Sequence, residues 1–250
     1  MNRCIASAGV ALFAGALFPA WVAAAGGGVA WGEHANNDVG NVASLQRGAR
    51  NFVNYCMGCH SAKYVRFSRL ARDLDLSDDQ VITNLMFATE KADNTMDIAM
   101  PPKDAQDWFG QTPPDLTLIA RSKGTDYLFN FLRAFYIDES KGVGTNNLLL
   151  EGASMPHVLW ELQGLQKAVF SEPEEEGAEP SFKEFEQLTK GTMSAEEYDQ
   201  FVRDLVNFLD YTSAPEQLER KTIGAWVLLY LLVFLILAYM LKKEVWKDVK

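Results

Sequence analysis

Several stretches of this chain place hydrophobic residues at every third or fourth position, the spacing of one face of an α-helix. The first stretch covers residues 42–55, and we expect it to form a helix that delivers Cys56 at its carboxyl end. Gly48 lies on the inner side of this helix, where it is either a tolerated glycine or a point at which another helix approaches closely. The apolar positions of the stretch are Val42, Leu45, Ala49, Phe52 and Val53.

Two capping boxes predict where further helices begin. Ser77 is followed three residues later by Gln, and Ser194 by Glu, the arrangement in which two side chains cap the first turn of a helix. The second box opens an apolar stripe, so we expect a helix over residues 195–211. We also expect this helix to pack against the helix at 42–55.

The middle of the chain alternates helical patterns with irregular stretches. Residues 115–120 and 125–136 have helical spacing. Residues 90–114 contain two Pro-Pro pairs, and residues 137–154 are rich in Gly, Asn and Thr, so both are expected to be irregular. The sequence therefore predicts a mostly α protein with long loops.

The amino terminus has the pattern of a secretory signal peptide. Arg3 precedes an apolar run, and the small residues Ala23, Ala24 and Ala25 follow it. We predict that residues 1–25 are a signal peptide. Cys4 would leave with it, so the mature chain would keep two cysteines, Cys56 and Cys59.

The carboxyl terminus has the pattern of a membrane anchor. Residues 222–241 carry no charge and would form a helix roughly 30 Å long, the thickness of a bilayer core. Four lysines follow this span, against two basic residues before it, so the positive-inside rule puts residues 242–250 in the cytoplasm. Together with the signal peptide, this predicts a single-pass protein of the bacterial inner membrane with residues 26–219 in the periplasm.

The exported domain is strongly acidic. Within residues 26–219 lie 31 of the 33 Asp and Glu residues but 16 of the 23 Lys and Arg residues, a net charge near −15. This charge excludes nucleic acid as a partner. Five glutamates at 172–179 form an acidic insert, which is either a solvated loop or a docking patch for a basic partner.

The candidate chemistry lies in the motif Cys56-Met57-Gly58-Cys59-His60. Two thiols three residues apart followed by a histidine are typical of c-type haem attachment, in which both thiols form thioethers and the histidine binds iron. A zinc site would need further ligands at matching spacing, and a thioredoxin-like pair would not need the histidine. We therefore predict one haem c, held covalently by Cys56 and Cys59, with His60 as an iron ligand.

Residue spacing alone does not identify the second iron ligand. An empty position would permit peroxidase or gas-sensor chemistry, whereas a thioether would raise the reduction potential and close the site to small molecules. Met100 and Met155 both precede proline, which favours an extended backbone suited to presenting a ligand from a loop. The remaining candidates are Met96, Met100, Met155, His34 and His157.

Three segments together resemble one known family. Residues 56–67, residues 113–121 and residues 152–157, followed by a single carboxy-terminal anchor, are similar to cytochrome c1, the haem subunit of the cytochrome bc1 complex, in its proteobacterial form. The resemblance covers nearly the whole chain. It implies a cytochrome c fold and Met155 as the second iron ligand, with Met100 as the remaining alternative. The haem contacts it implies are Pro113, Pro114, Tyr127 and either Arg121 or Lys123.

The resemblance also implies a function in electron transfer. The chain would accept an electron from the Rieske iron–sulfur protein and pass it to a soluble or tethered cytochrome c. It would do so beside cytochrome b in a dimeric, quinol-oxidising complex, and would not be an enzyme on its own. The alternative is an anchored monohaem cytochrome that feeds a terminal oxidase.

Overall fold

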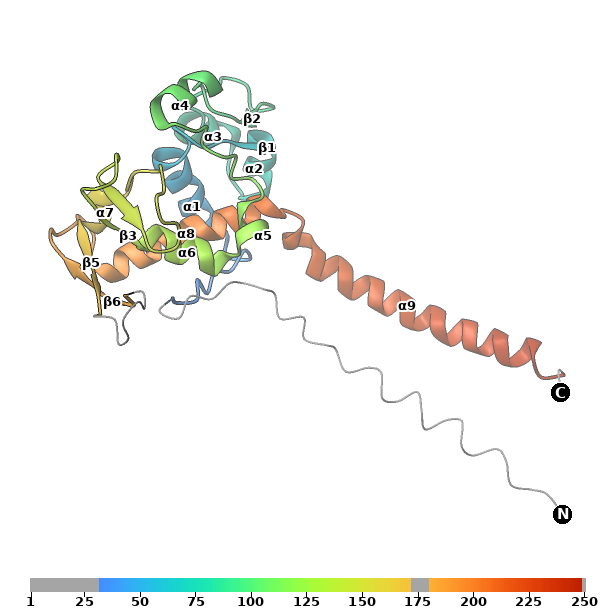
Figure 1. Cartoon of the computed structure of the whole chain (residues 1–250). Helices are drawn as coiled ribbons and strands as arrows, with labels where there is room; N and C mark the ends of the chain where they lie inside the picture. Colours follow the sequence, from blue (N-terminus) through green and yellow to red (C-terminus); the bar gives the residue numbers. More distant parts are fainter. Residues whose placement is uncertain (1–31, 172–179, 249–250) are drawn as a thin grey trace, which may run out of the picture.

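The computed structural model describes residues 32–171 and 180–248 (Figure 1). The predicted signal peptide and the acidic insert at 172–179 lie outside these residues. The helices are α1 Val42–Tyr55, α2 Phe67–Asp73, α3 Asp78–Leu85, α4 Pro102–Phe109, α5 Ile119–Lys123, α6 Thr125–Arg133, α7 Trp160–Gln163, α8 Ala195–Ser213 and α9 Gln217–Val245. The strands are β1 Ala62–Arg66, β2 Thr95–Met96, β3 Phe135–Ile137, β4 Thr145–Asn147, β5 Gln166–Phe170 and β6 Phe182–Gln187.

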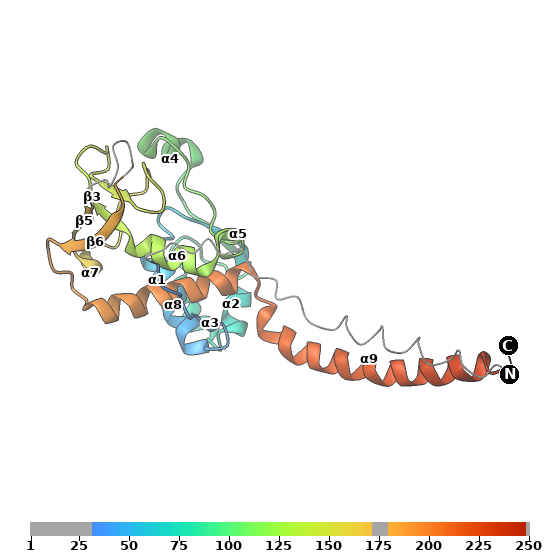
Figure 2. The same ribbon diagram turned by 60° about the horizontal axis from the view of Figure 1, so that its bottom comes forward.

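Helices α1 and α8 cross at the centre of the domain, as the sequence predicted (Figure 2). At Gly48 the two backbones approach so closely that a Cβ atom would lie 2.1 Å from the carbonyl oxygen of Asp204 and 2.7 Å from Cβ of Phe208. The rings of Phe52 and Phe208 pack nearby with centroids 5.5 Å apart. Gly48 is therefore a point of close helix approach rather than a tolerated glycine.

A buried carboxylate also joins the two helices. Asp204 on α8 is 2% exposed and accepts hydrogen bonds from Ser44 Oγ at 2.7 Å and from Nε and Nη2 of Arg47 at 2.6 and 2.9 Å. Buried charges need such partners, because an unpaired one would cost several kcal/mol. Both predicted capping boxes, at Ser77 and Ser194, are present in the structure.

The structure corrects three boundaries in the middle of the chain. Residues 90–114 are not wholly irregular, because they contain strand β2 and helix α4. Helix α4 begins at Pro102 and ends before Gly110, which has φ 73°. Hydrophobic spacing does not detect these two signals. The helix predicted over 115–120 begins at Ile119, and the helix predicted over 125–136 ends at Arg133.

The described residues also form three small two-stranded antiparallel sheets, β1–β2, β3–β4 and β5–β6, which the sequence did not predict. Strand β3 follows α6 directly and pairs Phe135 with Asn147 and Tyr136 with Asn146. Short strands of two to six residues give too weak an alternation to detect in sequence. The chain is nevertheless mostly helical, as expected.

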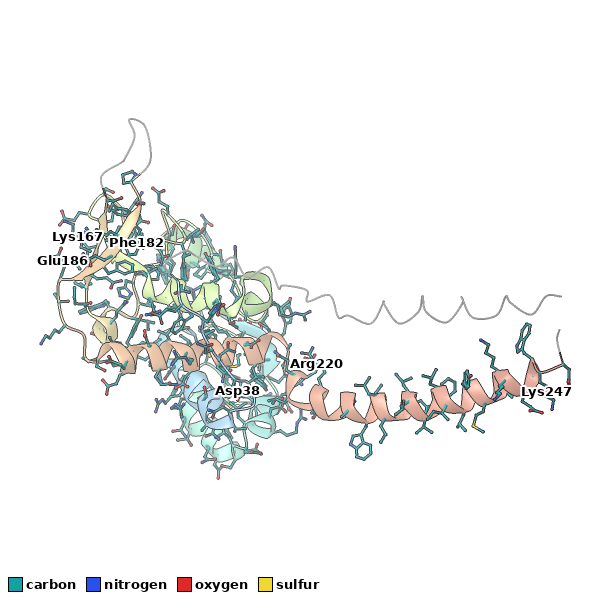
Figure 3. All side chains as sticks on the ribbon, turned by 90° about the horizontal axis from the view of Figure 1, so that it is seen from below. Asp38, Lys167, Phe182, Glu186, Arg220 and Lys247 are labelled. Atoms are coloured by element: carbon teal, nitrogen blue, oxygen red, sulfur yellow. The ribbon has the colours of Figure 1, made fainter. Side chains whose placement is uncertain are left out.

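Helix α9 leaves the domain and projects away from it (Figures 1 and 3). It contains the whole predicted span 222–241, and its apolar side chains from Ile223 onward are exposed. Arg220 and Lys247 lie at its two ends in Figure 3. Among the described residues it is the one helix long and apolar enough to cross a membrane.

Candidate haem site

A cleft opens beside the end of α1, where the predicted haem motif lies. Cys56 caps α1, and the N–H groups of Cys59 and His60 both donate to the carbonyl of Cys56, at 3.0 and 2.8 Å. This turn puts the two thiols and the imidazole on the cleft. The cleft is lined by Tyr55, Cys56, Cys59, His60, Phe109, Gln111, Pro113, Pro114, Ser154, Met155, Pro156 and Val158.

The cleft encloses about 600 Å³, counting the part that is open to solvent. Half of its lining residues are aromatic, proline or methionine, and Val158 adds another apolar side chain, as expected of a site for a largely apolar ring system.

The imidazole of His60 is oriented to bind a metal through one nitrogen. Nδ1 lies 2.7 Å from the carbonyl oxygen of Pro114. Since a carbonyl can only accept, Nδ1 carries the proton and Nε2 keeps a free lone pair. Burial lowers the pKa of His60, although the Pro114 contact and the charge of Asp115 oppose it, so the ring is neutral and able to ligate.

Asp115, which the sequence analysis did not single out, holds the Pro114 carbonyl in place. Its carboxylate accepts hydrogen bonds from Ser61 Oγ at 2.7 Å, from the N–H of Lys63 at 2.9 Å and from the N–H of Thr117 at 3.0 Å. The segment after the motif and the segment after Pro114 are thereby joined. A carboxylate directly after a Pro-Pro pair is the signal that could have indicated this role.

The two thiols of the motif are not paired with each other in a disulfide. Burial, together with the neighbouring Cys59, raises the pKa of Cys56 to about 12, so this thiol is neutral. Within residues 32–171 and 180–248 no group of three or more His, Cys, Asp or Glu side chains could hold a metal ion. The donor set thus fits a c-type haem, which needs two thiols and one imidazole, better than zinc, which needs four ligands.

Of the five candidates for the second iron ligand, Met155 is the one that lines this cleft in the described part of the chain. Met96 is fully buried on β2 opposite Ala62, and Met100 precedes α4 outside the cleft. His34 is exposed and pairs with Asp126, its Nδ1 lying 2.7 Å from Oδ2.

His157 is buried rather than open to the cleft. Its ring lies parallel to that of Phe135, with centroids 5.2 Å apart and an interplanar angle of 3°. Burial lowers the pKa of His157 to about 4, against the smaller opposing effects of Gly164 and Gln163, so the ring is neutral at physiological pH.

Not all predicted haem contacts line the cleft. Pro113 and Pro114 do, whereas Arg121, Lys123 and Tyr127 are not among its lining residues. Tyr127 stacks on Phe131, with centroids 6.0 Å apart, and the ammonium of Lys123 lies 5.6 Å from the centre of the Tyr127 ring. Arg121 is exposed on α5.

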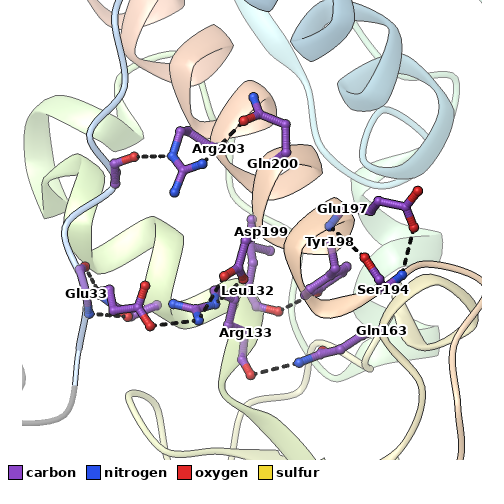
Figure 4. Close-up of polar contacts among 12 residues, drawn as sticks. Glu33, Leu132, Arg133, Gln163, Ser194, Glu197, Tyr198, Asp199, Gln200 and Arg203 are labelled. Carbon is purple, nitrogen blue, oxygen red and sulfur yellow. Dashed lines mark hydrogen bonds and ion pairs between the residues drawn. The ribbon is translucent and has the colours of Figure 1, made fainter.

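A larger cleft lies between β6 and the start of α8. It contains none of the predicted site residues. Figure 4 shows its polar wall, where Arg133 is held between Glu33 and Asp199 at 3.1 and 2.7 Å. The Arg133 guanidinium is therefore already paired with two carboxylates and is not available to bind an anionic ligand.

Comparison with known proteins identifies the family. Residues 34–249 match the Cytochrome C1 family. The chain is 47% identical to cytochrome c1 of Allochromatium vinosum over 233 residues, which are 93% of this chain and 95% of that protein. The chain belongs to the cytochrome c1 family. Its cofactor is therefore haem c, and it is a haem-carrying electron-transfer subunit of the cytochrome bc1 complex.

Two further relatives show the range of the resemblance. The ammonia monooxygenase gamma subunit of Nitrosomonas europaea is 44% identical over 206 residues, 82% of this chain and 83% of that protein. The mitochondrial cytochrome c1 heme protein of Saccharomyces cerevisiae is 25% identical over 246 residues, 88% of this chain and 72% of that protein. The similarity thus extends from a bacterial relative with a different name to a mitochondrial cytochrome c1.

Proposed function

We propose that this chain accepts one electron from the Rieske iron–sulfur protein and passes it to a soluble or tethered cytochrome c. It acts next to cytochrome b in a dimeric complex that oxidises quinol. The observation that carries the proposal is one cleft lined by Cys56, Cys59, His60 and Met155. These are the residue types that hold a six-coordinate c-type haem.

Each residue of this set has a distinct task. Cys56 and Cys59 would hold one haem c through two thioethers, and His60 and Met155 would be the ligands of its iron. When bound, the haem supplies a one-electron ferric–ferrous couple. The hydrogen bond to Pro114 fixes the His60 ring, so this ligand would change little between the two redox states.

We further propose that α9 anchors the chain in the bacterial inner membrane. Residues 222–241 cross the bilayer, residues 26–219 form the periplasmic haem domain and residues 242–250 form the cytoplasmic tail. Residues 1–25 are the cleaved signal peptide. Lys242 and Lys243 in the last turn of α9 support this orientation through the positive-inside rule.

Purification of the intact chain from its native membrane in mild detergent tests the proposed partners. We expect cytochrome b and an iron–sulfur protein to accompany it and quinol to reduce the c haem. Recovery with a terminal oxidase, or with monooxygenase subunits as the name of the Nitrosomonas relative suggests, would contradict the proposed partners. Either result would leave the haem chemistry standing.

Replacement of single methionines tests the ligand assignment. Met155→Leu should leave haem attached but lower the reduction potential, by on the order of 0.1 V, a part of the ≈ 0.8 V that axial ligands span. It should also allow carbon monoxide to bind the reduced protein. Met100→Leu is the matched control, because Met100 also precedes a proline but lies outside the cleft. The reverse outcome would transfer the ligand role to Met100.

A further inference from the structure

Met155 lies on a segment with little regular structure, between the end of β4 at Asn147 and the start of α7 at Trp160. A ligand on such a segment moves with it, because irregular segments open locally at low free-energy cost. Both ends of this segment are nevertheless fixed to the same small sheet. Strand β4 supplies the contact before Met155, and strand β3 supplies the contact after it.

The contact before Met155 is made by Asn146. Its side chain is 2% exposed, and Oδ1 accepts hydrogen bonds from the N–H groups of Asn147 and Gly152, both at 2.9 Å. Its Nδ2 donates to Oδ2 of Asp138 at 3.0 Å. Gly152 has φ 73°, a conformation that favours glycine, so the turn three residues before Met155 is held in one geometry.

The contact after Met155 is made by His157, which is 5% exposed. Its ring lies flat against Phe135, the residue of β3 that pairs with Asn147 of β4. The aromatic contacts continue from Phe135 to Phe131, at 5.2 Å between centroids, and from Phe131 to Tyr127, at 6.0 Å. His157 is therefore joined to α6 through a series of packed rings.

We propose that Asn146 and His157 are positioning residues that keep the sulfur of Met155 on the iron by fixing its segment to the β3–β4 sheet on both sides. This inference rests on the proposed function, in which Met155 is the second iron ligand. Loss of either contact would give the segment more conformational freedom when Met155 is dissociated from the iron. It would therefore favour dissociation of Met155.

The test uses Asn146→Ala and His157→Ala in the full chain, purified with haem attached. We expect the fraction of reduced protein that binds carbon monoxide to rise about tenfold in each variant, a factor that corresponds to about 1.4 kcal/mol. The reduction potential should fall toward that of Met155→Leu. Hydrogen exchange at the Gly152 amide should become faster in Asn146→Ala.

Matched variants separate positioning from ordinary stability. Asn207→Ala removes another buried asparagine, which donates to the carbonyl of Asp38 at 2.7 Å and to Ser44 Oγ at 3.0 Å, far from Met155 in the sequence. It should lower the unfolding temperature without changing carbon monoxide binding or the potential. His157→Phe keeps a flat ring against Phe135 and should behave like the natural protein.

A second variant of Asn146 covers the case in which Asn146→Ala does not fold. Asn146→Asp combined with Asp138→Asn exchanges the two groups, which keeps their mutual hydrogen bond and an acceptor for Gly152. The double variant should keep Met155 on the iron and bind carbon monoxide no more than the natural protein does. Asn146→Asp alone puts two carboxylates together and should increase carbon monoxide binding.

The outcomes are distinct. In one outcome, Met155→Leu allows carbon monoxide to bind, but the variants of Asn146 and His157→Ala behave like Asn207→Ala. The positioning proposal is then overturned and the ligand assignment stands. If Met155→Leu itself leaves the spectrum and potential unchanged, both the assignment and the positioning role are wrong. The electron-transfer function is tested separately, by the partners that purify with the chain.

Discussion

The cleft is built from two kinds of segment. Residues 55–60, the motif segment, follow one another at the end of α1, so a single turn brings the two thiols and the imidazole together. Residues 154–158, the Met155 segment, lie between two contacts with the β3–β4 sheet, the hydrogen bond from Gly152 to Asn146 and the ring contact of His157 with Phe135. One segment is positioned by consecutive residues, and the other by contacts with residues of other elements.

This difference has a consequence for stability. The motif segment follows a helix that packs on α8 with almost no free space, so moving it requires disturbing the core. The Met155 segment is irregular, and hydrogen bonds and one ring contact join it to the β3–β4 sheet. We therefore expect the Met155 side of the cleft to open at a lower free energy than the motif side.

Removal of both thiols of the motif segment should have the largest effect. Cys56→Ala combined with Cys59→Ala should abolish covalent attachment, because no other cysteine among the described residues can form a thioether. Haem staining after a denaturing gel measures this as presence or absence of signal. Met155→Leu is the control and should keep full staining. Staining of the double variant would show that the motif is not the attachment site.

Substitution of Gly48 tests the packing that supports the motif segment. Gly48→Ala adds a Cβ atom 2.1 Å from a backbone oxygen of Asp204, and backbone cannot move aside cheaply. We expect a loss of about 3 kcal/mol in the free energy of unfolding, the upper range for an overpacked core, measured by denaturant titration. Gly142→Ala, where nothing lies within 4 Å, is the control. Equal stability of the two variants would show that α1 and α8 are not closely packed.

Substitution of Asn147 tests the Met155 segment alone. Its buried side chain donates to the carbonyl of Phe131 at 2.8 Å and accepts from the N–H of Leu149 at 2.9 Å. Asn147→Ala should cost about 2 kcal/mol, because it leaves buried groups without partners. Hydrogen exchange should become faster in residues 148–158 but not in α1. Faster exchange in both regions would mean that the two segments are not independent.

The smallest expected effect is the pH dependence contributed by Asp115. Burial raises the pKa of this carboxyl, but hydrogen bonds from Lys63, Thr117 and Ser61 outweigh burial, so its pKa lies below the ordinary 3.8. A lowered pKa in the folded state gives stability that is present above pH 3.8 and lost as the pH falls through the lower folded pKa. The natural protein should therefore exceed Asp115→Asn in unfolding free energy at neutral pH. That difference should shrink below pH 3.8 in acid titrations, and a constant difference would contradict this account.

The sequence by itself determined what is local. The helical spacing of 42–55, the two capping boxes and the order of Cys56, Cys59 and His60 depend on residues within four positions of one another. The long uncharged stretch in α9 is of the same kind. These predictions of structure are confirmed because neighbours in the sequence are necessarily neighbours in space.

Only the tertiary structure decided the rest. Spacing gave no reason to prefer Met155 over Met100 or Met96, because the cleft that separates them is formed by residues about 50 to 100 positions apart. The same holds for the Pro114 carbonyl on His60, for Asp115, and for Asn146 and His157 around Met155. Their roles depend on which strands and loops meet, and such contacts leave no periodic signal in the chain.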